Sequence, residues 1–144
     1  MRGAIVAFCA AVLVGAGCGG GDRLSKAEFQ QRANAICAKY QKRIDALGQP
    51  QSIDEVSKWV DKVIPLVEAE IDEMDDLKPP EEDQETFDQM IAKAEETRDA
   101  GEELGNAAEK NDQAAVQAAL EKGQKSGDEA DRLAGELELD DCQN

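Results

Sequence analysis

Apolar residues recur at steps of three and four through most of residues 24–137, which is the spacing of one face of an α-helix. Turn-forming residues interrupt the pattern near Gly48, at Lys78-Pro79-Pro80 and at Asn111-Asp112. The chain is therefore predicted to be all-α, with a single domain of four helices. Short connections favour an up-down bundle, in which the first and fourth helices lie side by side.

The first predicted helix has a specific start signal. Ser25 and Glu28 have the spacing of a capping box, and Leu24 with Phe29 supplies a hydrophobic staple. The apolar stripe that follows contains Phe29, Ala33, Ile36, Cys37, Tyr40, Ile44 and Leu47, and ends at Gly48. This register places Cys37 in the core.

The second predicted helix starts at another capping box, formed by Ser52 and Glu55. Its stripe runs from Val56 to Leu77 and is interrupted by Pro65. Proline removes one backbone hydrogen bond, so we expect a kink within a continuous helix. The alternative is that two helices meet there.

Two further helices follow the double proline. Pro80 and the acidic residues after it suit the first turn of the third helix, and Asp112 suits the N-cap of the fourth. Gly101 and Gly105 in the third helix indicate either fraying or close packing. In the fourth, the small residues at 123, 126 and 127 indicate close approach of a neighbour or, equally, a local break.

The amino terminus has the layout of a bacterial lipoprotein signal. An apolar run from Ala4 to about Val14 is too short to span a membrane, which takes roughly 20 residues, and Gly15-Ala16-Gly17-Cys18 follows it. We expect cleavage before Cys18 and lipidation of its thiolate. Gly15 stands where such motifs usually carry Leu, and the alternative is a plain secretory signal.

This signal predicts three regions and a location. Residues 1–17 are the cleaved signal, residues 18–23 are the lipidated cysteine with a flexible leash, and residues 24–144 are the helical domain. The chain is expected at the extracytoplasmic face of the cell membrane, anchored by two acyl chains on Cys18.

Two cysteines remain for the domain. Cys9 leaves with the signal and Cys18 is lipidated, so Cys37 and Cys142 are left in an oxidising setting, where we expect a disulfide. Closing a loop of roughly 100 residues is worth about 4.7 kcal/mol in the chain-entropy model. The alternatives are two free thiols or an intermolecular bridge.

The charge balance excludes several functions. The chain has 16 Lys and Arg against 32 Asp and Glu, and removal of the signal takes away only Arg2, leaving a charge of −17. Such an acidic surface argues against nucleic acid and anionic lipid headgroups as partners. Histidine is absent, which removes the commonest general base and the commonest zinc ligand.

No catalytic residues, metal site or cofactor are predicted. Paired carboxylates such as Asp75-Asp76 are more typical of solvated helix faces than of cation sites, and none has the spacing of an EF-hand. No acidic residue is assigned to an apolar stripe, so two-carboxylate hydrolysis is not indicated either. Tyr40 and Trp59 are candidates to line a ligand pocket, although aromatic residues at helical spacing are more often core.

Three segments resemble a family of small exported proteins and lipoproteins of high-GC Gram-positive bacteria. They are Leu24-Ser25-Lys26-Ala27-Glu28-Phe29, Ala33-Asn34-Ala35-Ile36-Cys37 and Leu139-Asp140-Asp141-Cys142. Many members carry a Lys-x-Glu-Phe segment, an Ala-x-x-Ile-Cys segment and a terminal Cys. The resemblance implies an extracytoplasmic helical domain with one disulfide, and it implies no activity.

These observations predict a membrane-anchored, non-enzymatic helical module that contacts an envelope protein or serves as a structural element. The alternative is a lipoprotein that binds a small ligand or a cation in a pocket between helices. For that pocket the sequence indicates the second and third helices near Pro65 and Gly101.

Overall fold

A computed structural model describes residues 23–143 of the chain. The helices are α1 (Lys26–Asp45), α2 (Ile53–Asp75), α3 (Gln84–Glu109) and α4 (Gln113–Glu136), with 3-10 turns η1 (Glu81–Asp83) and η2 (Asp140–Cys142). The described residues contain no strand, so the all-α prediction with four helices is confirmed. The predicted signal and Cys18 lie outside the described residues.

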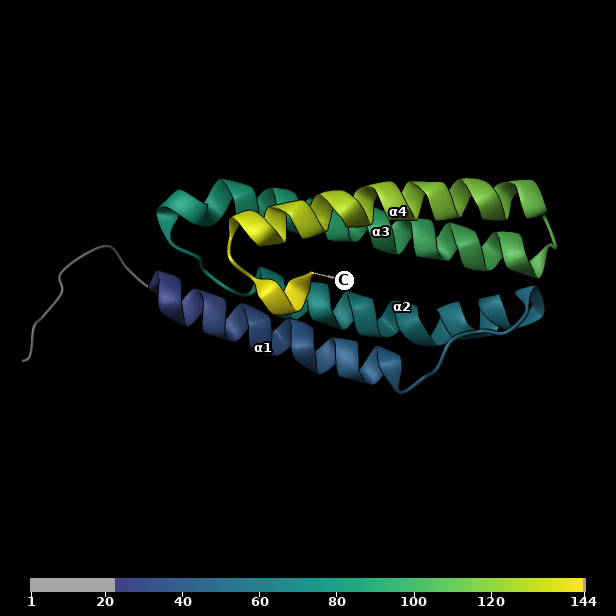
Figure 1. Ribbon diagram of the computed structural model, residues 1–144, viewed down its shortest axis with the longest axis horizontal. Coiled ribbons are helices and arrows are strands. Elements are labelled where there is room, and N and C mark those ends of the chain that lie inside the picture. The colour runs from purple at the N-terminus through teal and green to yellow at the C-terminus, as the bar shows by residue number, and fades with distance from the viewer. Residues whose placement is uncertain (1–22, 144) are drawn as a thin grey trace, which may run out of the picture.

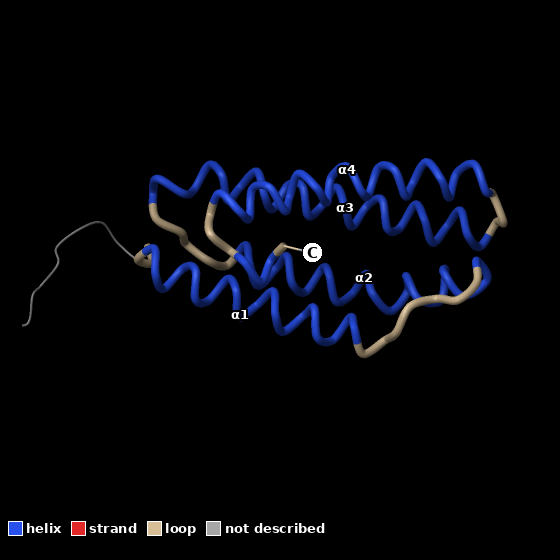
Figure 2. Tube along the Cα trace, in the orientation of Figure 1, coloured by secondary structure: helices blue, strands red, loops and turns tan. Residues whose placement is uncertain are grey.

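The helices lie along one long axis, and α1 is the one that stands apart. Figure 1 shows α3 and α4 side by side, with α2 and α1 on the other side of the molecule. Residues 46–52 connect the shorter α1 to the far end of α2, as Figure 2 shows. The prediction that the first and fourth helices lie side by side is wrong. The backbones of α1 and α4 make no contact, because α1 packs against α2 and η2 instead.

Ser25, Ser52 and Asp112 are each the N-cap of a helix, as predicted, whereas the residues after Pro80 form a 3-10 turn and α3 begins at Gln84. One of the two predicted capping boxes forms. Ser25 and Glu28 form the capping box, with Ser25 N donating to Glu28 Oε2 at 3.2 Å. The Asp112 carboxylate accepts from Ala115 N at 3.0 Å. Ser52 makes no side-chain cap, because Glu55 reaches one residue further upstream and accepts from the backbone N–H of residue 51 at 2.8 Å.

Proline and glycine do not break the helices. α2 is one helix through Pro65, so the two-helix alternative is wrong. α3 is continuous through Gly101 and Gly105, and a Cβ added at Gly105 would lie 2.9 Å from Val60 Cγ1. These glycines therefore let α2 approach α3 closely, and α4 is likewise unbroken through its own glycines.

The chain turns back at the end of α4. Glu138 adopts the left-handed conformation, with φ 59°, and Leu139 N donates to Ala134 O at 2.9 Å. Glu138 N donates to Gly135 O at 3.1 Å, which completes a Schellman motif. The tail, residues 137–143, then runs along α1 with Leu139 fully buried.

This return brings the two cysteines together. Cys37 and Cys142 form a disulfide, with their Cα atoms 5.1 Å apart. The predicted pairing is confirmed.

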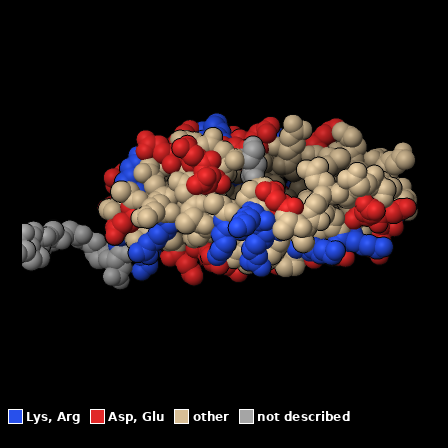
Figure 3. Space-filling model, turned by 60° about the horizontal axis from the view of Figure 1, so that its bottom comes forward, with Lys and Arg blue, Asp and Glu red and all other residues tan. Residues whose placement is uncertain are grey.

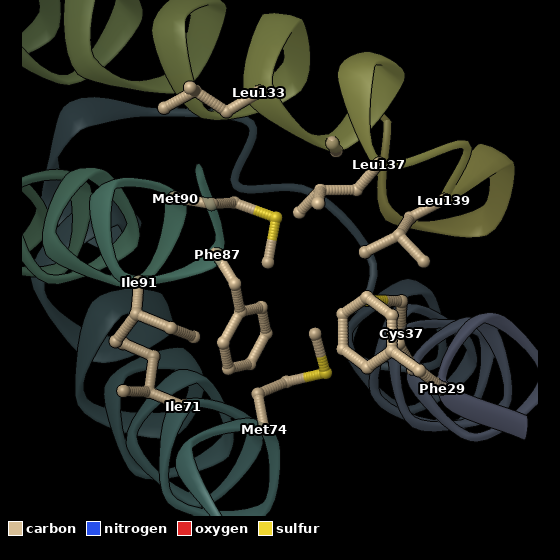
Figure 4. Close-up of a cluster of buried hydrophobic side chains, with 12 residues drawn as sticks. Phe29, Cys37, Ile71, Met74, Phe87, Met90, Ile91, Leu133, Leu137 and Leu139 are labelled. Carbon is tan, nitrogen blue, oxygen red and sulfur yellow. The ribbon is translucent and has the colours of Figure 1, made fainter. Parts of the chain in front are cut away.

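The main core lies where the tail covers α1. Phe29 and Phe87 pack edge to face, with ring centroids 5.2 Å apart and an interplanar angle of 90°. Figure 4 shows side chains of all four helices and the tail around these rings. The cluster comprises Phe29, Ala33, Cys37, Ile71, Met74, Phe87, Met90, Ile91, Leu133, Ala134, Leu137 and Leu139.

Removing the disulfide tests how much the tail contributes to stability. We expect the double substitution Cys37→Ala and Cys142→Ala to lower the free energy of unfolding by about 3–5 kcal/mol, because the closed loop no longer restricts the unfolded chain. Urea unfolding measures this. A reductant should bring the wild type to the level of the variant without altering the variant, and equal stability of the two oxidised proteins would contradict the expectation.

Candidate functional site

The core opens into a cavity of about 200 Å³, here called the central cavity. It receives side chains from all four helices and from the tail, and the disulfide forms part of its wall. The apolar part of the lining consists of Ile44, Val67, Ile71, Met74, Met90, Ile91, Ala94 and Ala130. In Figure 3, which brings the α1 side of the molecule forward, a recess lies near the middle of the face with acidic groups at its edge.

Helix length explains why this space is open. α1 ends at Asp45 while its neighbours continue, and the tail reaches only to the disulfide. The tail fills the space between α1 and α4 on one side of that point. Beyond it, the small residues Gly127 and Ala130 on α4 leave room that no side chain occupies.

The polar lining is acidic or neutral. It consists of Gln41, Glu70, Thr97, Asp131 and Asp141, and no Lys or Arg lines the cavity. The Thr97 hydroxyl donates to Lys93 O at 2.9 Å, and its oxygen lies 2.9 Å from Ser126 Oγ, so it is already satisfied within the helices.

Among the polar residues of the lining, Glu70 is the one with a carboxylate that lacks a hydrogen-bond partner and is partly removed from water. Its carboxylate is partly buried and makes no hydrogen bond to any described residue. Burial raises its pKa to about 7, because the charged form loses hydration; the nearby Lys39 opposes this rise and Glu73 adds to it.

Glu73, one helical turn further along α2, has the opposite environment. It accepts a hydrogen bond from the Tyr40 hydroxyl at 2.6 Å and pairs with the Lys39 ammonium. The Lys39 and Tyr40 hydrogen bonds lower the pKa of Glu73, and the same contact raises the pKa of Tyr40. Glu73 has thus taken the hydrogen bonds of Lys39 and Tyr40, and Glu70 interacts with Lys39 only through its charge.

The two aromatic residues predicted for a pocket do not line the central cavity. Tyr40 is buried with its hydroxyl on Glu73, and Trp59 Nε1 donates to Gly48 O at 2.5 Å, which fastens the loop after α1. The region of Pro65 and Gly101 is also closed, since a Cβ at Gly101 would lie 3.1 Å from Ile64 Cδ1. The central cavity lies between α2 and α3 as well, but it begins beyond this region, at Val67 on α2 and Thr97 on α3.

Sequence reasoning missed Glu70, although its spacing carried a signal. Glu70 stands three residues after Val67 and four before Met74, both on the predicted stripe of the second helix. The statement that no acidic residue falls on a stripe is therefore wrong. A carboxylate at this spacing borders the apolar face and reaches into the cavity that the face lines.

The net negative charge of the chain also hides the fact that α1 is basic. α1 carries five Lys and Arg residues and two acidic residues, for a charge of +3 in a chain of −16. Figure 3 shows basic side chains in a row along one edge of this face. The acidity of the protein is therefore concentrated on the other helices.

Comparison with protein-family models, curated proteins and solved structures finds no match for this chain. The resemblance in the three sequence segments stays an expectation. Within residues 23–143, no group of three or more Cys, Asp or Glu residues is placed to hold a metal ion.

No helix in the described part of the chain is long and apolar enough to cross a membrane.

The raised pKa of Glu70 makes stability depend on pH. Because the folded state binds this proton more tightly than the unfolded state, the stabilisation is present below pH 4.5 and is lost as the pH rises through about 7. We expect Glu70→Gln to remove this loss and to stabilise the protein at pH 8 by on the order of 1–2 kcal/mol after allowance for partial exposure, with little effect at pH 4.5.

Urea unfolding at several pH values measures this difference. Glu68→Gln is the matched control, because Glu68 lies on the same helix with its side chain exposed. An equal response of the two variants at pH 8 would contradict the assignment.

Proposed function

We propose that the mature chain is a lipid-anchored, extracytoplasmic lipoprotein whose up-down four-helix domain binds a small ligand in the central cavity without catalysis. The observation that carries this proposal is the cavity itself, which is lined by all four helices and the tail. It favours ligand binding over a purely structural role, because an unfilled interior costs stability that a structural module has no reason to lose.

The size and lining of the cavity support this function. An engineered cavity of about 150 Å³ with apolar walls binds benzene, and the central cavity has about 200 Å³. Cys37 and Cys142 are joined to each other, and the Thr97 hydroxyl is bonded within the helices, so none of the three offers a free nucleophile to the cavity.

The start of the fold supports the anchor. Arg23 donates to Pro79 O at 2.9 Å and to Gln84 Oε1 at 2.6 Å, and Leu24 N donates to Lys78 O at 2.8 Å. Arg23 is therefore held by the domain rather than belonging to a leash. Four residues separate it from Cys18, so the two residues are at most roughly 18 Å apart, and a lipid on Cys18 keeps this end of the bundle at the membrane.

Intact-mass measurement on protein from the membrane fraction of a lipoprotein-processing bacterium tests the anchor. We expect a mature chain that starts at Cys18 and carries the mass of the lipid, because a cleaved and lipidated cysteine needs no further segment for anchoring. Cys18→Ser should appear in the soluble exported fraction. An unlipidated wild-type chain would contradict the anchor while leaving ligand binding intact.

Ligand binding is tested by filling the cavity. A side chain at Gly127 has open space, since an added Cβ meets no atom within 4 Å, and we expect Gly127→Leu to occupy the cavity. A ligand at 100 times its dissociation constant stabilises the wild type by about 2.7 kcal/mol, and this gain should be lost in the variant. Denaturation with a panel of small cationic, neutral and anionic ring compounds measures it.

Ala114→Leu is the matched control, on the same helix with an exposed side chain. It should keep the full stabilisation. If no compound in the panel stabilises the wild type more than Gly127→Leu, ligand binding in this cavity is contradicted.

The basic surface of α1 favours a second function, contact with an acidic envelope partner. Arg32 and Lys42 are exposed on α1. We expect the charge reversals Arg32→Glu and Lys42→Glu together to reduce crosslinking to such a partner in cells, because attraction between opposite charges is lost. Lys110→Glu with Lys125→Glu, on exposed positions of α3 and α4, is the control. Equal crosslinking of both variants would contradict this contact.

A further inference from the structure

We infer that the ligand of the central cavity is an apolar amine, a small molecule with a ring or branched aliphatic body and one ammonium group that pairs with Glu70. This inference rests on the proposed function and specifies its ligand. It follows from the charges of the lining, the missing partner of Glu70 and the shape of the apolar walls.

The charges around the cavity select the sign of the ligand. Its lining includes the carboxyl groups of Glu70, Asp131 and Asp141, contributed by α2, α4 and the tail, and no basic side chain. Low-dielectric walls strengthen the field of such groups. An anionic ligand is therefore repelled and a cation is attracted.

Glu70 supplies the specific contact. Its neighbour Glu73 holds the Lys39 ammonium and the Tyr40 hydroxyl, and the Gln41 amide donates to Asp45, so none of these α1 donors bonds to Glu70. A partly buried carboxylate without a hydrogen-bond partner is stabilised either by a proton or by a cation. A ligand ammonium offers three N–H donors and replaces the proton.

The walls define the rest of the ligand. Ile71 and Ile91 present branched side chains, and Met74 and Met90 present thioethers that adapt to irregular shapes and make favourable contacts with aromatic rings. Figure 4 shows the two methionines extending from α2 and α3 toward the same interior space. A bare metal ion leaves these walls unused and finds too few oxygen ligands, since hard cations take six or more.

Binding of such an amine depends on pH. The charges that act on Glu70 are those of Lys39 on α1 and Glu73 on its own helix, while Asp131 of α4, Asp141 of the tail and the neutral Thr97 of α3 line the same cavity. The pKa of Glu70 is about 7, whereas an alkylammonium titrates near 10. The carboxylate and the ammonium therefore coexist above pH 7, and binding weakens below it.

Three compounds with one phenylethyl or phenylpropyl body test the charge preference: 2-phenylethylamine, 2-phenylethanol and 3-phenylpropionate. Their dissociation constants are measured by NMR titration of the full mature chain, residues 18–144, at pH 8 and pH 5. We expect the amine to bind at least about tenfold more tightly than the alcohol at pH 8, as a charge-assisted hydrogen bond requires, and the anion to bind most weakly.

Glu70→Gln should lower the affinity for the amine to that of the alcohol and leave the alcohol unchanged. Glu68→Gln should alter neither. At pH 5 the wild type should lose most of its preference for the amine.

The outcomes separate this inference from the proposed function. If amine and alcohol bind equally, or if Glu70→Gln keeps the preference, the amine assignment is overturned while ligand binding stands. A third outcome is that none of the three compounds binds the wild type, while other members of the panel stabilise the wild type and not Gly127→Leu. In that case the amine assignment is wrong and the proposed ligand binding remains. If no compound binds the cavity at all, the amine assignment and the proposed ligand binding are both overturned.

Discussion

The return of the C-terminal tail across α1 is the constraint on which this structure depends. α1 is the helix with least backbone contact to the rest of the bundle, and its backbone does not meet that of α4. Leu139, fully buried, and the disulfide between Cys37 and Cys142 supply the missing layer between them. Glu138 makes the return sharp by adopting a left-handed conformation that costs a non-glycine residue about 1 kcal/mol. The core around Phe29 exists because the tail closes it.

The same arrangement produces the central cavity. α3 and α4 present small side chains to each other and pack along their whole length, while Gly105 lets α2 join them closely. The central cavity opens further along the same three helices, where Ile71, Ile91 and Ala130 line it. The remaining volume is bounded by the second half of α1 and by the end of the tail, where neither is long enough to fill it. The cavity is thus a consequence of unequal helix coverage rather than of any single small residue.

The sequence predicted the helices well because their signals are local. The capping box of Ser25, the N-cap of Asp112 and the turn residues between helices each act within a few positions, and so does the apolar period. The disulfide was predicted because Cys9 was assigned to the cleaved signal and Cys18 to lipidation, which left Cys37 and Cys142 as a pair. What could not be predicted depends on distances between helices: whether glycines in α3 pack or fray, and whether α1 meets α4 or the tail. Tyr40 and Trp59 were misplaced in a pocket for the same reason, since their hydrogen-bond partners lie on other segments.

Glu70 and Glu73 show how strongly the site depends on the position of α1. They are the same residue type one turn apart on α2, yet the pKa of one is raised and that of the other lowered. The difference arises because burial raises the pKa of Glu70, whereas Glu73 is exposed and accepts hydrogen bonds from Lys39 and Tyr40 on α1. Since the disulfide joins α1 to the tail, it helps to fix the position of α1 in which Lys39 and Tyr40 contact Glu73. The same helix thus links the disulfide to the different environments of the two carboxylates.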